Sequence, residues 1–216
     1  MKQIFNFSKN DLILELKIKA NIEILNTENN AFVNFQSDSK SLTIEHNEKD
    51  MLSIVNSKNL KNIKSLKNFL NFIQDNIEEK EQNIANIKIY IPQNSNITLK
   101  SNKAQLTIKA SLNKFEAKIN TASINILEYI KQCYIKVNTL NLSSNKAFER
   151  LYLKVNSGII KLEANKQTLK YEIKANNANI DINKNDFNGI VVQNGETNLQ
   201  NEKIIEIKNN GFINIS

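Results

Sequence analysis

The chain of 216 residues is poor in several residue types that particular protein classes require. It contains one cysteine (Cys133), one proline, four glycines, a single arginine (Arg150) and no tryptophan. One cysteine excludes a disulfide framework and a zinc site built from cysteines. Four glycines cannot supply a collagen, a P-loop or a dinucleotide-binding fingerprint. The single histidine, His46, has no second histidine with which to form a metal site or a catalytic triad. We therefore expect no catalytic residues, no metal site and no cofactor.

The composition is that of a basic protein with enough hydrophobic residues to form a core. Hydrophobic residues make up 40% of the chain and charged residues 24%, with a formal net charge of +7. About +6 of this charge falls in residues 101–216, which hold 15 Lys and Arg150 against 10 acidic residues. A basic surface favours anionic partners. With one arginine and no tryptophan, however, the chain lacks the residue types that read or stack on nucleic acid, so specific nucleic-acid binding is not expected.

Hydropathy places the chain outside the usual membrane and secretory patterns. No apolar run of signal-peptide length follows Met1, and no stretch of eighteen apolar residues occurs. We expect a location in the cytoplasm or at the periphery of the cell envelope.

The N-terminal part of the sequence contains two different periods. Residues 1–57 alternate apolar and polar side chains, as in Leu12, Leu14 and Leu16, which predicts short half-buried strands. Over residues 58–80 the apolar residues instead recur every three or four positions, which predicts one inserted amphipathic helix. This helix either covers the end or side of a sheet or, through its lysines, lies on a membrane surface.

Strands are expected again over residues 87–216, and there the sequence repeats. A Lys-x-Asn unit begins at Lys100, Lys118, Lys136, Lys154 and Lys174, at separations of 18, 18, 18 and 20 residues. Two looser copies surround 192–194 and 208–210. Each copy has alternating apolar residues, a turn led by Asn, and two more apolar residues two positions apart. A unit this short cannot bury its apolar side alone, whereas stacked copies bury a continuous core.

The repeat therefore predicts an all-β fold: a right-handed β-solenoid, or single-stranded β-helix, of about 18 residues per rung with one inserted helix. We expect one domain over 1–216, with N-terminal strands at 1–57, a helical insertion or cap at 58–80 and the repeat region at 87–216. A left-handed hexapeptide helix is excluded because its register from Ile119 falls on Asn125 and Lys131. A β-sandwich remains an alternative, because evenly spaced strands also build sandwiches.

Three segments carry a resemblance to a known family: Ile87-Lys88-Ile89-Tyr90-Ile91-Pro92 and the turns at 156–162 and 209–215. Together they resemble the bacterial putative-adhesin β-solenoid family of unknown function, over about residues 10–216. The bactofilins, which polymerise end to end, are a more distant likeness. The resemblance implies a right-handed β-solenoid, a bacterial origin and no known enzyme activity.

The phase of the repeat separates inward from outward side chains. Cys133 shares the inward phase of Ile135 and Val137, so we expect a core residue rather than a nucleophile. One lysine per rung should face solvent and form a candidate polyanion-binding ladder of Lys100, Lys118, Lys136, Lys154 and Lys174. The alternative is a solvated charged edge. The asparagines should form a structural ladder that fixes register, made of Asn102, Asn120, Asn138, Asn156, Asn176 and Asn194.

The function expected from these features is that of a non-enzymatic binding or scaffold module. Its expected partners are an anionic cell-wall polymer, met through the basic face, or another protein. Two alternatives from other classes are a structural protein that self-associates end to end and a peripheral membrane regulator that uses residues 58–80. A carbohydrate-active β-helix remains open, because a fold does not fix a function.

Overall fold

The computed structural model describes residues 2–7, 11–37, 42–47, 51–56, 84–195 and 203–216, and these residues are all-β. They contain no helix, and none therefore that could cross a membrane. The all-β prediction is confirmed, whereas the predicted helix at 58–80 lies outside the described residues. One mixed sheet holds the strands β1 (Lys2–Asn6), β2 (Asp11–Asn26), β3 (Phe32–Ser37), β4 (Leu42–Asn47), β5 (Met51–Asn56), β6 (Ile84–Ile91), β7 (Ser95–Lys109), β8 (Leu112–Ile126), β9 (Ile130–Ala147), β10 (Arg150–Ala164), β11 (Lys170–Lys184), β12 (Ile190–Gln193), β13 (Ile204–Lys208) and β14 (Ile213–Ile215).

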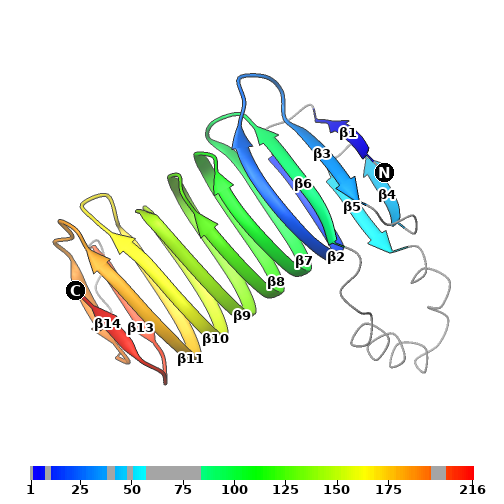
Figure 1. Cartoon of the computed structure of the whole chain (residues 1–216). Helices are drawn as coiled ribbons and strands as arrows, with labels where there is room; N and C mark the ends of the chain where they lie inside the picture. Colours follow the sequence, from blue (N-terminus) through cyan, green and yellow to red (C-terminus); the bar gives the residue numbers. More distant parts are fainter. Residues whose placement is uncertain (1, 8–10, 38–41, 48–50, 57–83, 196–202) are drawn as a thin grey trace, which may run out of the picture.

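The long strands stack in parallel in chain order. β7 to β11 pair with one another consecutively, and β2 precedes them as the neighbour of β7 (Figure 1). Residues at equivalent places in the repeat are paired: Lys118 lies opposite both Lys100 and Lys136. The separation of 18 residues read from the sequence is thus the step from one strand to the next.

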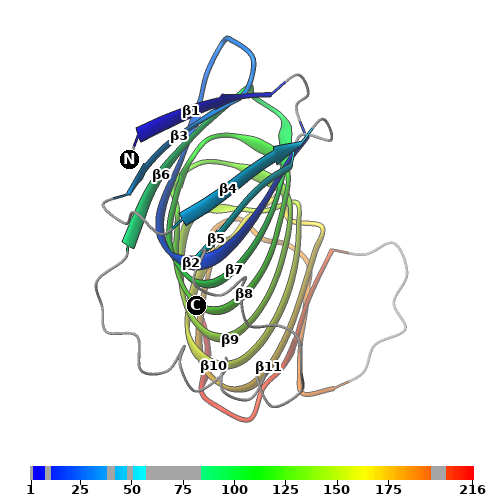
Figure 2. The same ribbon diagram turned by 90° about the vertical axis from the view of Figure 1, so that its right-hand side faces the viewer.

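Strands β7 to β11 each bend near the middle, and this bend reverses the side-chain phase. In β8 the inward residues are Phe115, Ala117 and Ile119 before the bend and Ala122, Ile124 and Ile126 after it. Successive side chains in a strand alternate between faces, so a step of three between Ile119 and Ala122 requires two outward residues in a row. These are Asn120 and Thr121. Figure 2 shows the resulting curvature of the strands around a common centre.

We call the part of each strand before the bend the first arm and the part after it the second arm. The first arms are 95–101, 112–119, 130–137, 150–155 and 170–175; the second arms are 103–109, 121–126, 139–147, 157–164 and 177–184. Apolar side chains from both arms fill the space between them, among them the fully buried Phe115 and Tyr171, and Phe148, between β9 and β10, is buried in the same core. Burial of each isoleucine contributes about 1.5–3 kcal/mol, so the apolar contacts between rungs hold the stack together. Cys133 is fully buried in this core, as the sequence predicted.

The two ends of the stack are built differently. At the N-terminal end β5 and β6 pair in parallel with β2, after which β4, β3 and β1 add in antiparallel orientation. At the C-terminal end β13 lies between β11 and β12, and β14 pairs with the second arm of β11. The C-terminal edge strands are therefore β12 on the first-arm side and β14 on the second-arm side.

Candidate functional site

A row of lysines runs across the outward face of the first arms. Strand pairing places them on successive strands, in register: Lys100, Lys118, Lys136, Lys154, Lys174 and Lys208. We call these six residues the lysine row. Neighbouring strands lie about 4.8 Å apart, so the row is a regular line of positive charge. The structure brings together all five lysines singled out in the sequence and adds Lys208.

Carboxylates neutralise the two ends of the lysine row. Lys100 Nζ lies 2.5 Å from Glu15 Oε1 on β2. At the other end, Lys174 Nζ lies 2.6 Å from Glu172 Oε1, and Lys208 Nζ lies 3.7 Å from Glu206 Oε1. The hydrogen bond between Lys174 and Glu172 raises the pKa of the lysine and lowers the pKa of the carboxyl group. Both groups are therefore charged at neutral pH.

The middle of the row has no such compensation. Within the described part of the chain, Lys118, Lys136 and Lys154 have no carboxylate within ion-pair distance. We call these three residues the basic centre. Two positions earlier along the strands, β9 and β10 carry Tyr134 and Tyr152, between Glu116 on β8 and Glu172 on β11.

Aromatic rings and the only arginine extend the basic centre along the first arms. Lys136 Nζ lies 6.0 Å from the ring centroid of Tyr152, and Lys114 Nζ lies 5.3 Å from that of Tyr134. Arg150 occupies the next outward row, opposite Gln132 and Lys170. The tyrosine rings hold the lysine side chains near the sheet surface, so the cations are partly positioned before any ligand arrives.

A groove of about 600 Å³ follows the bend between the lysine row and the asparagines. Val137, Val155 and Ala175 lie between its two walls, which are formed by Lys136, Lys154, Lys174 and Lys208 on one side and by Asn138, Asn156 and Asn176 on the other. Ammonium groups and side-chain amides both donate hydrogen bonds. The groove therefore presents donors along a line about four strands long.

The asparagines of the repeat occupy the bend, although one predicted member lies elsewhere. Asn102, Asn120, Asn138, Asn156 and Asn176 are all exposed at this corner, and Asn176 Nδ2 donates to Asn156 Oδ1 over 3.1 Å. The next place belongs to Asn210, whose Nδ2 lies 3.4 Å from Asn176 Oδ1. Asn194 instead follows β12 with a φ of 52°, and its side-chain oxygen accepts the Asn209 N–H.

Two further features of the described residues bear on chemistry. They contain no cluster of three or more His, Cys, Asp or Glu residues suited to a metal ion. Burial raises the pKa of the Cys133 thiol far above its usual range, so this thiol stays protonated. The chemistry that the basic centre and its groove offer is therefore that of cations and hydrogen-bond donors.

Comparison with known proteins returns neither a matching family model nor a matching curated protein. Among solved structures the chain is similar to a putative adhesin from Bacteroides fragilis, with 10% identity, a TM-score of 0.47, and coverage of 100% of this chain and 95% of that one. It is similar to a putative cell adhesion protein from Clostridium sporogenes, with 16% identity, a TM-score of 0.37 and coverage of 100% and 98%. It is also similar to a putative lipid binding protein from Parabacteroides distasonis, with 12% identity, a TM-score of 0.35 and coverage of 100% and 96%.

Proposed function

We propose that the protein is a right-handed β-solenoid of about 18 residues per rung that acts as a non-enzymatic binding module for an anionic polymer of the cell envelope. The observation that carries the proposal is the basic centre: three successive lysines without carboxylate partners in the described structure, in the middle of a row whose ends are neutralised. A charged edge that served only for solubility would not need this distribution.

The solenoid part of the proposal has its support in the strand register. Five long strands pair in parallel, each with the next in the chain, and equivalent residues of the repeat lie opposite one another. The chain winds around the core once per repeat, which is the construction of a β-solenoid.

The ligand class follows from the geometry of the basic centre. Like charges at a spacing of about 4.8 Å repel one another, and an anion seated between them removes that repulsion. A polymer with regularly repeated negative charge, such as a teichoic acid or an acidic polysaccharide, can engage several rungs at once. Binding of a polyanion along an exposed row of lysines relies on many weak contacts and is sensitive to salt.

The experiment is co-sedimentation of the purified protein with bacterial wall sacculi, either intact or stripped of teichoic acid, at low and high salt. The informative variant is Lys118→Gln/Lys136→Gln/Lys154→Gln. Its matched control, Lys103→Gln/Lys146→Gln/Lys184→Gln, removes the same charge from exposed lysines of the second arms.

We expect the wild type and the control to pellet with intact sacculi at low salt and to be released at high salt. The variant of the basic centre should stay in the supernatant. If both triple variants lost binding to sacculi equally, the binding would depend only on net charge, and the proposal would be overturned. Pelleting of the protein without sacculi would favour end-to-end self-association instead.

A further inference from the structure

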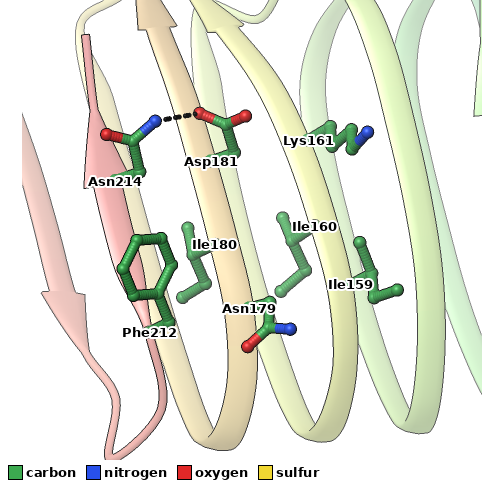
Figure 3. A pocket seen from close by; sticks show the side chains of 8 residues that line it. All are labelled: Ile159, Ile160, Lys161, Asn179, Ile180, Asp181, Phe212 and Asn214. Atoms are coloured by element: carbon green, nitrogen blue, oxygen red, sulfur yellow. Dashed lines mark hydrogen bonds between the residues drawn. The ribbon is translucent and has the colours of Figure 1, made fainter.

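A second surface lies on the opposite side of the stack, where the second arms of β10 and β11 meet β14. A hollow of about 300 Å³ opens there (Figure 3). Two neighbouring rows of outward side chains line it: Ile159, Asn179 and Phe212 in one, and Lys161, Asp181 and Asn214 in the other. None of these residues belongs to the lysine row or to its groove.

The first row exposes apolar side chains that packing does not require. Phe212 is 65% exposed and Ile159 is 47% exposed, and Asn179 lies between them. At the same place in the repeat, the preceding strands carry the polar residues Gln105, Ser123 and Asn141. Large apolar side chains thus replace polar ones only at this end of an otherwise polar row.

The second row supplies hydrogen-bonding groups beside the apolar ones. Asn214 Nδ2 donates to Asp181 Oδ1 over 2.9 Å, which fixes the orientation of the carboxylate and leaves its other oxygen available (Figure 3). Among the described residues, the side chains of Asn179 and Lys161 have no hydrogen-bond or ion-pair partner. Lys161 and Asp181 carry opposite charges, so the hollow as a whole is close to neutral.

We infer that this hollow binds one ring of a neutral saccharide. A sugar ring has an apolar face of C–H groups and an edge of hydroxyl groups, and the hollow offers one apolar row and one polar row side by side. The C–H face would lie against Phe212 and Ile159 while hydroxyls bind Asn179, Asp181 and Lys161. The near-neutral charge favours an uncharged sugar over an anionic one. Because all the lining residues belong to paired strands or adjoin one, the site is largely formed before binding.

The test is a titration of the full chain with four neutral probes, chitotetraose, cellotetraose, maltotetraose and mannotetraose, up to about 10 mM, followed by amide NMR shifts. The variants are Phe212→Ala and Asn179→Ala. The matched control is Ile4→Ala, because Ile4 is also 65% exposed but lies on β1 at the other end of the stack. The variant Lys118→Gln/Lys136→Gln/Lys154→Gln tests whether saccharide binding depends on the basic centre.

We expect at least one probe to shift the amides of Asn179, Asp181 and Phe212, with binding weakened at least about tenfold by Phe212→Ala or Asn179→Ala. Ile4→Ala and the triple lysine variant should bind like the wild type, at low and high salt. Binding of none of the four probes, or equal binding by Phe212→Ala, would overturn the inference. Shifts caused by an extended apolar peptide but by no saccharide would overturn it as well, and would identify the β14 edge as a strand-pairing site.

Discussion

The hydroxyl group of Tyr171 donates a hydrogen bond to the carbonyl oxygen of Glu163 at 2.6 Å, which joins β11 to the end of β10 inside the stack. The hydroxyl oxygen of Tyr171 also accepts the Phe148 N–H at 2.9 Å, and the Tyr171 and Phe148 rings meet edge to face with centroids 6.0 Å apart. Burial raises the pKa of Tyr171 to about 12, so the hydroxyl stays protonated over the range in which the protein would be studied. One side chain therefore satisfies two backbone groups near the connections between rungs.

Removal of that hydroxyl should destabilise the protein. Tyr171→Phe keeps the ring but leaves the Phe148 N–H without its acceptor, and an unsatisfied buried donor costs about 1–3 kcal/mol. We expect a loss of that size in the free energy of unfolding, measured with urea. Tyr152→Phe is the control, because the Tyr152 ring lies half-buried on the outer face and its change should stay within about 0.5 kcal/mol. Equal effects of the two substitutions would contradict the role given to Tyr171.

Gly158 leaves no room for a side chain between two neighbouring strands. Its φ is +154°, and a Cβ placed there would lie 1.8 Å from the carbonyl oxygen of Leu140 on β9. Backbone cannot move aside as a flexible side chain can, so Gly158→Ala should cost more than about 2 kcal/mol in unfolding free energy. Gly195→Ala is the control, since its nearest neighbour would be a Val192 methyl group at 3.2 Å. Thermal unfolding that leaves both variants equally stable would contradict this account.

The repeat made much of the fold predictable. Lys118, Lys136 and Lys154 recur at one step, and stacking of equivalent residues is the arrangement that buries each inward set. The phase of Cys133 and its neighbours likewise follows from alternation alone.

The parts that could not be predicted depend on pairings between distant segments. Glu15 meets Lys100 only because β2 lies beside β7, 85 residues along the chain. The ion pair that neutralises the Lys100 end of the lysine row could therefore not be predicted from the sequence. The sequence showed a looser copy at 208–210 but did not place Lys208 in the row, because its spacing is irregular: β12 precedes β13 in the chain, yet β13 is the strand that pairs with β11.

The same irregular end explains the two remaining differences. Asn194 was expected at the bend, but the pairing of β12 with β13 places it away from Asn176, and Asn210 takes the position. The hollow beside Phe212 depends on β14 pairing with the second arm of β11. The looser copy at 208–210 predicted two apolar residues after its turn, which are Ile213 and Ile215. Chain order, however, would stack this copy on the one at 192–194 rather than on β11.

Asn209 should contribute much more to stability than the exposed asparagines of the repeat. It is 4% exposed, and its side chain pairs with both backbone groups of Ala178: Nδ2 donates to the carbonyl oxygen at 2.8 Å, and Oδ1 accepts the N–H at 3.1 Å. Asn209→Ala would leave both groups unsatisfied, so we expect a loss of about 2–4 kcal/mol in urea unfolding. Asn156→Ala, at an exposed position of the bend, should change stability by less than about 0.5 kcal/mol. The reverse order would show that the exposed asparagines, rather than Asn209, hold the register.

Glu23 gives the stability of the N-terminal rungs a dependence on pH. Its carboxylate lies 2.7 Å from Lys109 Nζ and 3.4 Å from Lys88 Nζ. The hydrogen bond to Lys109 and the charge of that lysine, and to a smaller extent Lys88, lower the pKa of Glu23. A carboxyl group whose pKa is lower in the folded state stabilises the fold above its unfolded pKa of about 4.3, and this contribution is lost as the pH falls through the folded pKa. The lysines are about half exposed, so the contribution should stay below about 1 kcal/mol.

The measurement is urea unfolding of the wild type and Glu23→Gln at pH 7, 5 and 3. We expect the variant to be less stable at pH 7 and 5, and the difference to shrink toward zero near pH 3 because the wild-type carboxylate is then becoming protonated. Added salt should also reduce the difference at pH 7, since it screens these partly exposed charges. Glu128→Gln is the control, because Glu128 is exposed and has no ion pair in the described structure. A difference that persists unchanged at pH 3 would mean that Glu23 acts through packing of its side chain, because protonation removes the charge but leaves that packing in place.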